Sequence, residues 1–166
     1  MGLVLAFEED ENAVLGYHRE PGFSRGGLLD RAAMRRDAAE KIAAYDIRPP
    51  DCRLKTANFS GGNQQKIVLA REMERGPKVL LIGQPTRGVD VGAIEFIHRR
   101  IVEMRDAGCA ILLVSVELDE IRALSDRILV MFDGRVVGER GPGADERDLG
   151  CLMAGVGTDG REGRAA

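Results

Sequence analysis

The sequence predicts an α/β domain in which two parallel strands are joined by a helix and followed by a β-hairpin. Two short apolar runs, residues 79–82 and 110–114, lie on either side of a segment with helical periodicity. Strands that are apolar throughout are typical of a parallel sheet covered on both faces. Asp133-Gly134, a strong two-residue turn signal, separates two further strand-like segments and predicts the hairpin.

Residues 1–27 give little indication of structure, and the first clear element is a helix over residues 30–45. It combines strong helix formers with an N-cap residue, Asp30. A small apolar stripe follows near-helical spacing and consists of Ala33, Met34, Ala38, Ile42 and Tyr45. The two prolines Pro49-Pro50 then break the helix, and we expect a loop up to Phe59.

Two longer helices and a short one follow in the predicted order. The helix after Ser60-Gly61-Gly62 ends at Gly76-Pro77, and its inward positions are Ile67, Leu69, Ala70 and Met73. The crossover helix covers residues 92–108, with an apolar stripe of Ile94, Ile97, Ile101 and Met104. A short helix is predicted over residues 117–124. From Gly141 onward glycines and charges dominate, and we expect disorder there.

Two parallel strands and one hairpin are few for a doubly wound sheet, which needs more strands and helices to cover both faces. The predicted core is therefore incomplete. Either the chain is a piece of a larger domain, or it buries its exposed edge against another chain.

Composition excludes several classes of protein. Hydrophobic residues make up 44% of the 166, enough to form a core, and aromatic residues only 4%, so packing is aliphatic. A net charge of −3 with interspersed basic residues argues against a nucleic-acid-binding surface. Cys52, Cys109 and Cys151 have no metal-like spacing and indicate reduced thiols. No apolar run is long enough to cross a bilayer.

The segment Ser60-Gly61-Gly62-Asn63 is the strongest candidate binding site. A serine at a helix N-cap, followed by two residues without side chains, opens the backbone N–H groups and the helix dipole to an anion. An ordinary serine-capped helix has the same geometry, so this pattern alone leaves both interpretations open.

At this point the sequence resembles a known family. Residues 59–71, FSGGNQQKIVLAR, resemble the signature motif of ATP-binding cassette (ABC) proteins, and residues 79–90 resemble the end of the Walker B strand and the D-loop. The variant with Asn63 looks like the second cassette of tandem ATP-binding subunits of bacterial monosaccharide and nucleoside importers. The resemblance covers residues 2–139.

The resemblance implies a partial ABC nucleotide-binding domain. Residues 1–58 would form the helical subdomain, and residues 59–140 the C-terminal half of the parallel-sheet P-loop NTPase core, ending in the β-hairpin. Residues 141–166 would be the disordered tail. In this family ATP is held between the Walker A loop of one cassette and the signature motif of the other. The residues that would approach the γ-phosphate are Ser60, Gly61, Gly62 and Asn63, with Gln64 nearby, and Asp90 matches the D-loop aspartate.

The family also implies cofactors and partners. ATP and Mg²⁺ would act in the full assembly, with neither bound tightly to this chain alone. The partners would be another cassette, transmembrane permease subunits and, indirectly, an extracytoplasmic substrate-binding protein, with no nucleic acid. The expected location is the cytoplasmic face of the cell membrane.

The sequence departs from the family pattern at the positions that carry the hydrolytic chemistry. No Gly-Lys pair exists in the chain, so it holds no P-loop of its own. The Walker B acids are replaced by Gly83 and Gln84, and the switch histidine by Val116. Glutamine can position water but cannot accept a proton at neutral pH. We therefore predict no metal ligands and a site of its own that is deficient in ATP hydrolysis.

Two other functions stay open on the sequence. One is a non-catalytic regulatory or interaction module that keeps the cassette architecture but binds no nucleotide. The other is a cassette ATPase of DNA repair or chromosome organisation, which is disfavoured because the chain has no basic face and no flanking coiled-coil heptads.

Overall fold

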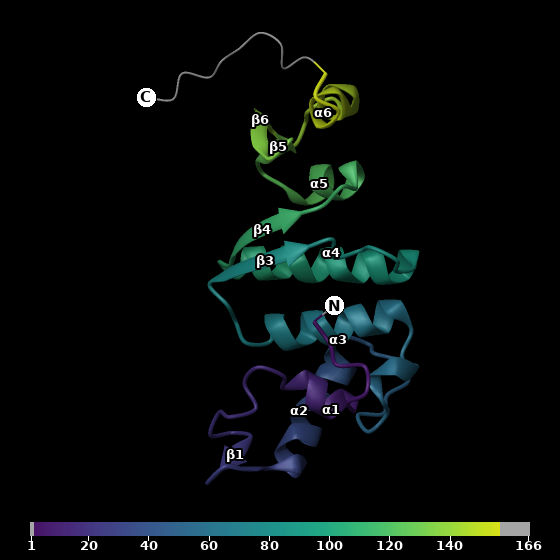
Figure 1. The fold of residues 1–166 in the computed structure, drawn as a ribbon, viewed down its shortest axis with the longest axis vertical. Coiled ribbons are helices and arrows are strands. Elements are labelled where there is room, and N and C mark those ends of the chain that lie inside the picture. The colour runs from purple at the N-terminus through teal and green to yellow at the C-terminus, as the bar shows by residue number, and fades with distance from the viewer. Residues whose placement is uncertain (1, 157–166) are drawn as a thin grey trace. The chain divides into compact units, whose positions relative to one another are not determined.

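A computed structural model describes residues 2–156 of the chain (Figure 1). The helices and strands group into two compact units, one formed by residues up to Leu80 with Pro85–Ala110, the other by Leu81–Gln84 and the chain from Ile111 onward. The elements in order are α1 (Glu9–Ala13), β1 (Ser24–Arg25), β2 (Leu28–Leu29), α2 (Arg31–Ala44), a 3₁₀ turn (Thr56–Asn58), α3 (Gly61–Met73), β3 (Val79–Gly83), α4 (Val91–Asp106), β4 (Ala110–Val114), α5 (Leu118–Leu124), β5 (Ile128–Phe132), β6 (Arg135–Arg140) and α6 (Glu146–Met153). The predicted α/β class is confirmed.

Three helices of the first unit, α2, α3 and α4, each begin at a side-chain cap. Asp30, Ser60 and Asp90 accept hydrogen bonds from the backbone N–H groups three residues later, at the starts of α2, α3 and α4. The predicted inward positions of α3 are all buried, as are Ile97 and Ile101 of α4. The apolar stripes therefore predicted these three helices correctly, and the cap signals at Asp30 and Ser60 are confirmed for α2 and α3.

The N-terminal segment pairs with the chain that leads into α3, and no local pattern in residues 1–27 indicates this pairing. The N–H groups of Glu9 and Asp10 donate to the carbonyls of Leu54 and Cys52 at 3.0 and 2.9 Å. In the other direction, the N–H groups of residues 56 and 57 donate to the carbonyls of residues 7 and 5 at 2.8 and 3.0 Å. We call this antiparallel pairing of residues 5–10 with residues 52–57 the clasp.

Asn12 of α1 reinforces the clasp from inside. Its fully buried amide donates to the Thr56 hydroxyl at 2.8 Å and to the Val4 carbonyl at 2.9 Å, and its oxygen accepts from the Val4 N–H at 2.8 Å. A buried amide with every group paired stabilises one arrangement over others, because any slip leaves polar groups unpaired. α1 also packs against α2 and α3.

The strands β3 and β4 pair in parallel, as predicted. The Ala110 N–H donates to the Lys78 carbonyl at 2.9 Å and the Gln84 N–H to the Val114 carbonyl at 2.8 Å, so residue numbers rise together along both strands. The prediction that both faces of these strands are buried is wrong. Side chains alternate instead, with Leu81 71% and Leu112 53% exposed. In the described part of the chain this sheet has only two strands, too few to cover both faces.

The second unit contains the predicted hairpin. β5 and β6 pair antiparallel across Asp133 and Gly134, whose φ angles of 46° and 73° suit a tight two-residue turn. The disorder predicted from Gly141 onward is wrong as far as residue 156. α6 begins at the cap Asp145 and buries Leu149 and Leu152 against Ile128 and Val130 of β5. Residues 157–166, the rest of the predicted tail, lie outside the described residues.

No helix among residues 2–156 is both long and apolar enough to span a membrane. The predicted boundary between residues 58 and 59 falls inside the first compact unit, and that division stays a prediction.

Candidate functional site

The N-terminus of α3 presents backbone donors beside a serine hydroxyl. Ser60 is exposed, and its Oγ accepts from the N–H of Asn63 at 3.4 Å and from the side-chain amide of Asn63 at 2.9 Å. The N–H groups of Gly61 and Gly62 have no acceptor among the described residues, as expected for the first turn of a helix. Two unpaired donors and the positive end of the helix dipole therefore lie at this turn, where Gly61 is exposed and Gly62 is buried.

The two amide side chains of this segment have structural partners. Asn63 Oδ1 accepts from the Arg48 N–H at 2.7 Å. Gln64 donates to the carbonyls of Thr56 and Phe59 at 3.2 and 2.9 Å. Sequence reasoning missed these bonds, because nothing in the spacing of residues 46–64 reveals which carbonyls turn back toward α3. They fix the approach of the chain to Ser60.

The structure brings the start of α4 next to this turn, within the same compact unit. A Cβ atom placed on Gly61 would lie 3.6 Å from the Gly88 carbonyl, and one placed on Gly62 would lie 3.5 Å from Asp90 Oδ2. Asp90 itself caps α4, because its Oδ1 accepts from the Ala93 N–H at 2.9 Å. This capping role was not predicted, although an aspartate directly before a helical stripe is a usual N-cap signal.

An open groove of about 390 Å³ lies between these two helix starts, and its wall includes Asn63, Asp90 and Phe96. Lys66 and Arg99 are its cations, and Asp46, Asp90 and Glu95 are its acids. Lys66 Nζ donates to the Asp46 carbonyl at 3.0 Å and lies 4.9 Å from the centre of the Phe96 ring. The lysine therefore already has partners, and the groove has no excess of positive charge.

Buried aromatic packing supports the wall of this groove. The Phe96 ring meets the fully buried Tyr45 ring edge-on, with centroids 5.7 Å apart, and the Arg100 guanidinium lies 4.5 Å above Tyr45. Burial raises the pKa of Tyr45 to about 12, so the phenol stays protonated and takes no part in acid–base chemistry near neutral pH.

The positions predicted to be degenerate lie in the second unit, at the carboxyl ends of β3 and β4. Gln84 adopts a left-handed backbone with φ 52°, directly after the last residue of β3, Gly83. Val116 follows β4 and is 62% exposed. Ser115 beside it accepts the Glu117 N–H at 3.0 Å at the start of α5. None of the three predicted positions offers a carboxylate or an imidazole.

No group of three or more His, Cys, Asp or Glu side chains that could hold a metal ion occurs among residues 2–156. Gly83 has no side-chain oxygen at the position where the resemblance places a magnesium-organising acid. The Gly83 position therefore supplies no side-chain ligand of the kind that Mg²⁺ prefers.

Comparison with known proteins shows which family shares this arrangement. No protein-family profile matches the chain. The guanosine import ATP-binding protein NupO of Bacillus subtilis is 49% identical over 156 residues, which are 93% of this chain and 30% of that protein. The nucleoside import ATP-binding protein NupA of Lactococcus lactis is 44% identical over 93% of this chain and 31% of its own length. The chain belongs to the ATP-binding cassette family. A third relative, the glucose import ATP-binding protein TsgD13 of Haloferax volcanii, is 46% identical over 88% of this chain.

Solved ABC structures share the fold. A dimeric post-hydrolysis structure of the ATP-binding cassette MJ0796, bound to ADP and phosphate, covers 86% of this chain with a TM-score of 0.69 and 24% identity. The ATP-binding subunit of another ABC transporter covers 92% with a TM-score of 0.70 and 21% identity. The ABC chain described here spans less than a third of the length of NupO and NupA, and about 60% of the cassette MJ0796.

Proposed function

We propose that this chain is the C-terminal part of the ATP-binding subunit of an importer for simple sugars or nucleosides. In this proposal it presents Ser60, Gly61, Gly62 and Asn63 to the γ-phosphate of an ATP molecule held by a partner cassette. The observation that carries the proposal is the start of α3, where a capped helix leaves two backbone N–H groups open beside residues without side chains. Relatives named as nucleoside and glucose import proteins support the assignment to importers.

The chemistry of the α3 start suits stabilisation of a phosphoryl group better than capture of a nucleotide. A helix N-terminus with fixed N–H donors stabilises negative charge that develops on transferring oxygens, because these dipoles are already oriented. The chain has no P-loop to cradle the α- and β-phosphates, and Lys66 is held by Asp46 and Phe96. Affinity for free ATP should therefore be low, and the triphosphate should be held by the partner.

Gly83, Gln84 and Val116 stand where the resemblance places two acids and a histidine, and we propose that the chain's own site does not hydrolyse ATP. Gln84 can orient water by hydrogen bonding but cannot remove a proton from it at neutral pH. The donors that Mg²⁺ prefers are missing at Gly83, so no step through the metal is assigned to this chain.

The proposal implies an assembly at the membrane. The partners would be a second cassette, permease subunits that form the pathway and, through them, an extracytoplasmic binding protein. The chain would lie at the cytoplasmic face of the membrane. The transported molecule would be selected by the permease and the binding protein.

A transport assay on the full-length subunit tests the assignment of roles. Gly61→Asp places a carboxylate at the open helix start and should abolish ATP-driven uptake by repelling the phosphate. Gln84→Ala serves as the matched control and should leave uptake largely intact, because the residue it replaces supplies no base. Uptake that survives Gly61→Asp and fails after Gln84→Ala would refute the proposal that the start of α3 contacts the phosphate and that Gln84 is dispensable.

A further inference from the structure

Glu9, the first residue of α1, carries a carboxyl group that is completely buried without a hydrogen-bond partner. Its exposed fraction is 0%, and neither side-chain oxygen has a partner among the described residues. A charged carboxylate in such a place costs several kcal/mol unless a cation or donors compensate it, so the group usually keeps its proton instead.

The cation that lowers the pKa of Glu9, Lys41 of α2, already has three hydrogen-bond acceptors of its own. Its Nζ donates to the Ala13 carbonyl at 3.2 Å, to the Tyr17 hydroxyl at 2.9 Å and to the Asp37 carboxylate. An ammonium group has three hydrogens, so these three acceptors account for all of them. Lys41 lowers the pKa of Glu9 only through space, and Asp37 opposes it.

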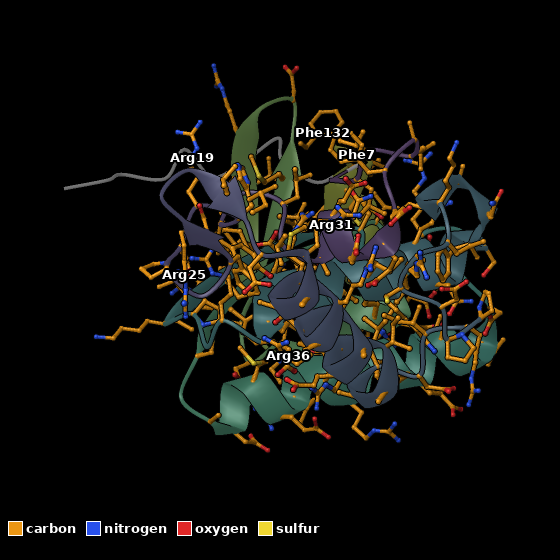
Figure 2. All side chains as sticks on the ribbon, turned by 90° about the horizontal axis from the view of Figure 1, so that it is seen from below. Phe7, Arg19, Arg25, Arg31, Arg36 and Phe132 are labelled. Carbon is orange, nitrogen blue, oxygen red and sulfur yellow. The ribbon has the colours of Figure 1, made fainter. Side chains whose placement is uncertain are left out.

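Three arginines of α2 and α3 near α1 are paired with groups other than Glu9. Arg31 and Arg35 of α2 lie 3.5 and 3.3 Å from the oxygens of Asp10. Arg71 of α3 donates to the Gly2 and Asn12 carbonyls and pairs with Glu72. Figure 2 labels Arg31, at the first turn of α2, and Phe7, in the clasp.

The remaining neighbours make a charge on Glu9 less favourable. Burial, with a further contribution from the adjacent Asp10, raises the pKa of Glu9 from 4.5 to about 8. In the segment opposite α1, burial raises the pKa of the Cys52 thiol, with Asp10 and Glu9 adding to the effect. Of the described groups that shift the pKa of Glu9, Lys41 is the cation, and its three hydrogens are donated to other acceptors.

We infer that Glu9 is a proton-dependent latch on the clasp, in which the neutral acid keeps residues 5–10 paired with residues 52–57 and loss of its proton opens that pairing. The placement is direct, because the Glu9 and Asp10 N–H groups are themselves two donors of the clasp. Ala57, which donates at the other end, is three residues before Ser60. An open clasp would therefore release the chain that leads to the start of α3.

The sign of the pH dependence follows from proton linkage. In the closed clasp the Glu9 carboxyl keeps its proton. In the open segment the carboxyl is hydrated and loses its proton to water above the ordinary pKa of glutamate. Opening is therefore least favourable at acid pH and becomes easier as pH rises from the ordinary pKa toward the raised one. One released proton makes the opening constant rise about tenfold for each pH unit between about pH 5 and 7.5, and the dependence levels off above about pH 8.

Amide hydrogen exchange on the whole chain measures this opening. Protection factors, corrected for intrinsic exchange, are compared at pH 5.5 and 7.5 for the N–H groups of Glu9, Asp10, Thr56 and Ala57, with Ile101 of α4 as the reference. We expect protection of the clasp to fall by between tenfold and a hundredfold relative to the reference. Glu9→Gln should remove this fall, and Glu40→Gln, at an exposed position of α2, should keep it.

Carbon-13 NMR titration of the Glu9 carboxyl in the unaltered chain tests, without any variant, whether Glu9 keeps its proton in the closed clasp. A midpoint near pH 8 supports the latch. A midpoint near the ordinary value, or clasp protection that does not change with pH, would overturn it even if Glu9→Gln did not fold. The measurement uses no nucleotide, so its outcome is separate from the outcome of the transport assay.

Discussion

Ser60 has two properties that substitution can separate. Its hydroxyl caps α3, and its lack of charge leaves the helix start attractive to an anion. Ser60→Ala should lower the free energy of unfolding by about 1 kcal/mol, because a capping acceptor is lost. Ser60→Asp should retain that stability, because aspartate caps equally well, while its charge repels a phosphate. Urea denaturation of the chain measures the first effect and uptake by the full-length subunit the second.

The two Ser60 variants are matched controls for each other. If Ser60→Ala and Ser60→Asp lose uptake in proportion to their loss of stability, Ser60 acts only as a cap. Uptake that is lost in the stable aspartate variant alone requires an anion at the helix start.

Gly62 is buried, yet its surroundings leave room for one methyl group. A Cβ atom there would lie 3.5–3.8 Å from Asp90, Ala93 and Val89, which is ordinary contact. Gly62→Ala should keep or raise the free energy of unfolding by up to about 1 kcal/mol, because alanine is the better helix former. Gly62→Leu should lower it by about 1–3 kcal/mol through overpacking. Thermal unfolding of both variants checks the difference, and equal melting temperatures would contradict it.

The sequence predicted the capping serine and the two glycines of the candidate site, but not the residues that hold them. Helical periodicity and a cap signal are local, so they can be read from neighbouring residues. The bonds from Gln64 to Thr56 and from Arg48 to Asn63 depend on how a loop with two prolines folds back. No local pattern encodes that path.

At the scale of elements, α6 shows why composition misled the prediction of disorder. Glycines and charges surround the segment, but Asp145 caps it and the pair Leu149 and Leu152 gives it a buried face. Two leucines three residues apart are enough to dock two helical turns on a hairpin. α1 and the two-residue strands β1 and β2 escaped prediction because they are too short to show a period.

Leu149→Ala should detach α6 from the hairpin. The side chain is 1% exposed, and truncation of a buried leucine costs about 2–5 kcal/mol. Limited proteolysis should then cut the chain after residue 140 much faster than in the unaltered protein. Met153→Ala, at an exposed position on the same helix, is the control and should leave the cleavage rate nearly unchanged.

At the scale of the whole molecule, the exposed face of β3 and β4 bears on the two explanations that the sequence left for an incomplete core. Leu81 and Leu112 are exposed in the second unit, together with Val114 and Val116. A patch of this kind marks an interaction surface or an aggregation risk. We propose that further residues of the same cassette cover it, because NupO and NupA extend far beyond the aligned segment.

Leu81→Thr combined with Leu112→Thr tests this proposal. Threonine keeps a strand-forming side chain and removes apolar surface, so the variant chain should associate less than the unaltered chain in size-exclusion chromatography with light scattering. In the full-length subunit the same pair should lower the melting temperature, because buried contacts would be lost. An unchanged full-length melting temperature would show that the face is not buried there.

Thr56 accepts hydrogen bonds from two side chains, because Asn12 donates to its hydroxyl and Gln64 donates to its carbonyl. Two side chains thus connect the beginning of the polypeptide to the first turn of α3, bypassing the intervening forty-odd residues of backbone, α2 included. A protein that binds and displaces residues 4–8 would therefore also shift the first turn of α3, where we propose that a phosphate binds, without contacting that turn.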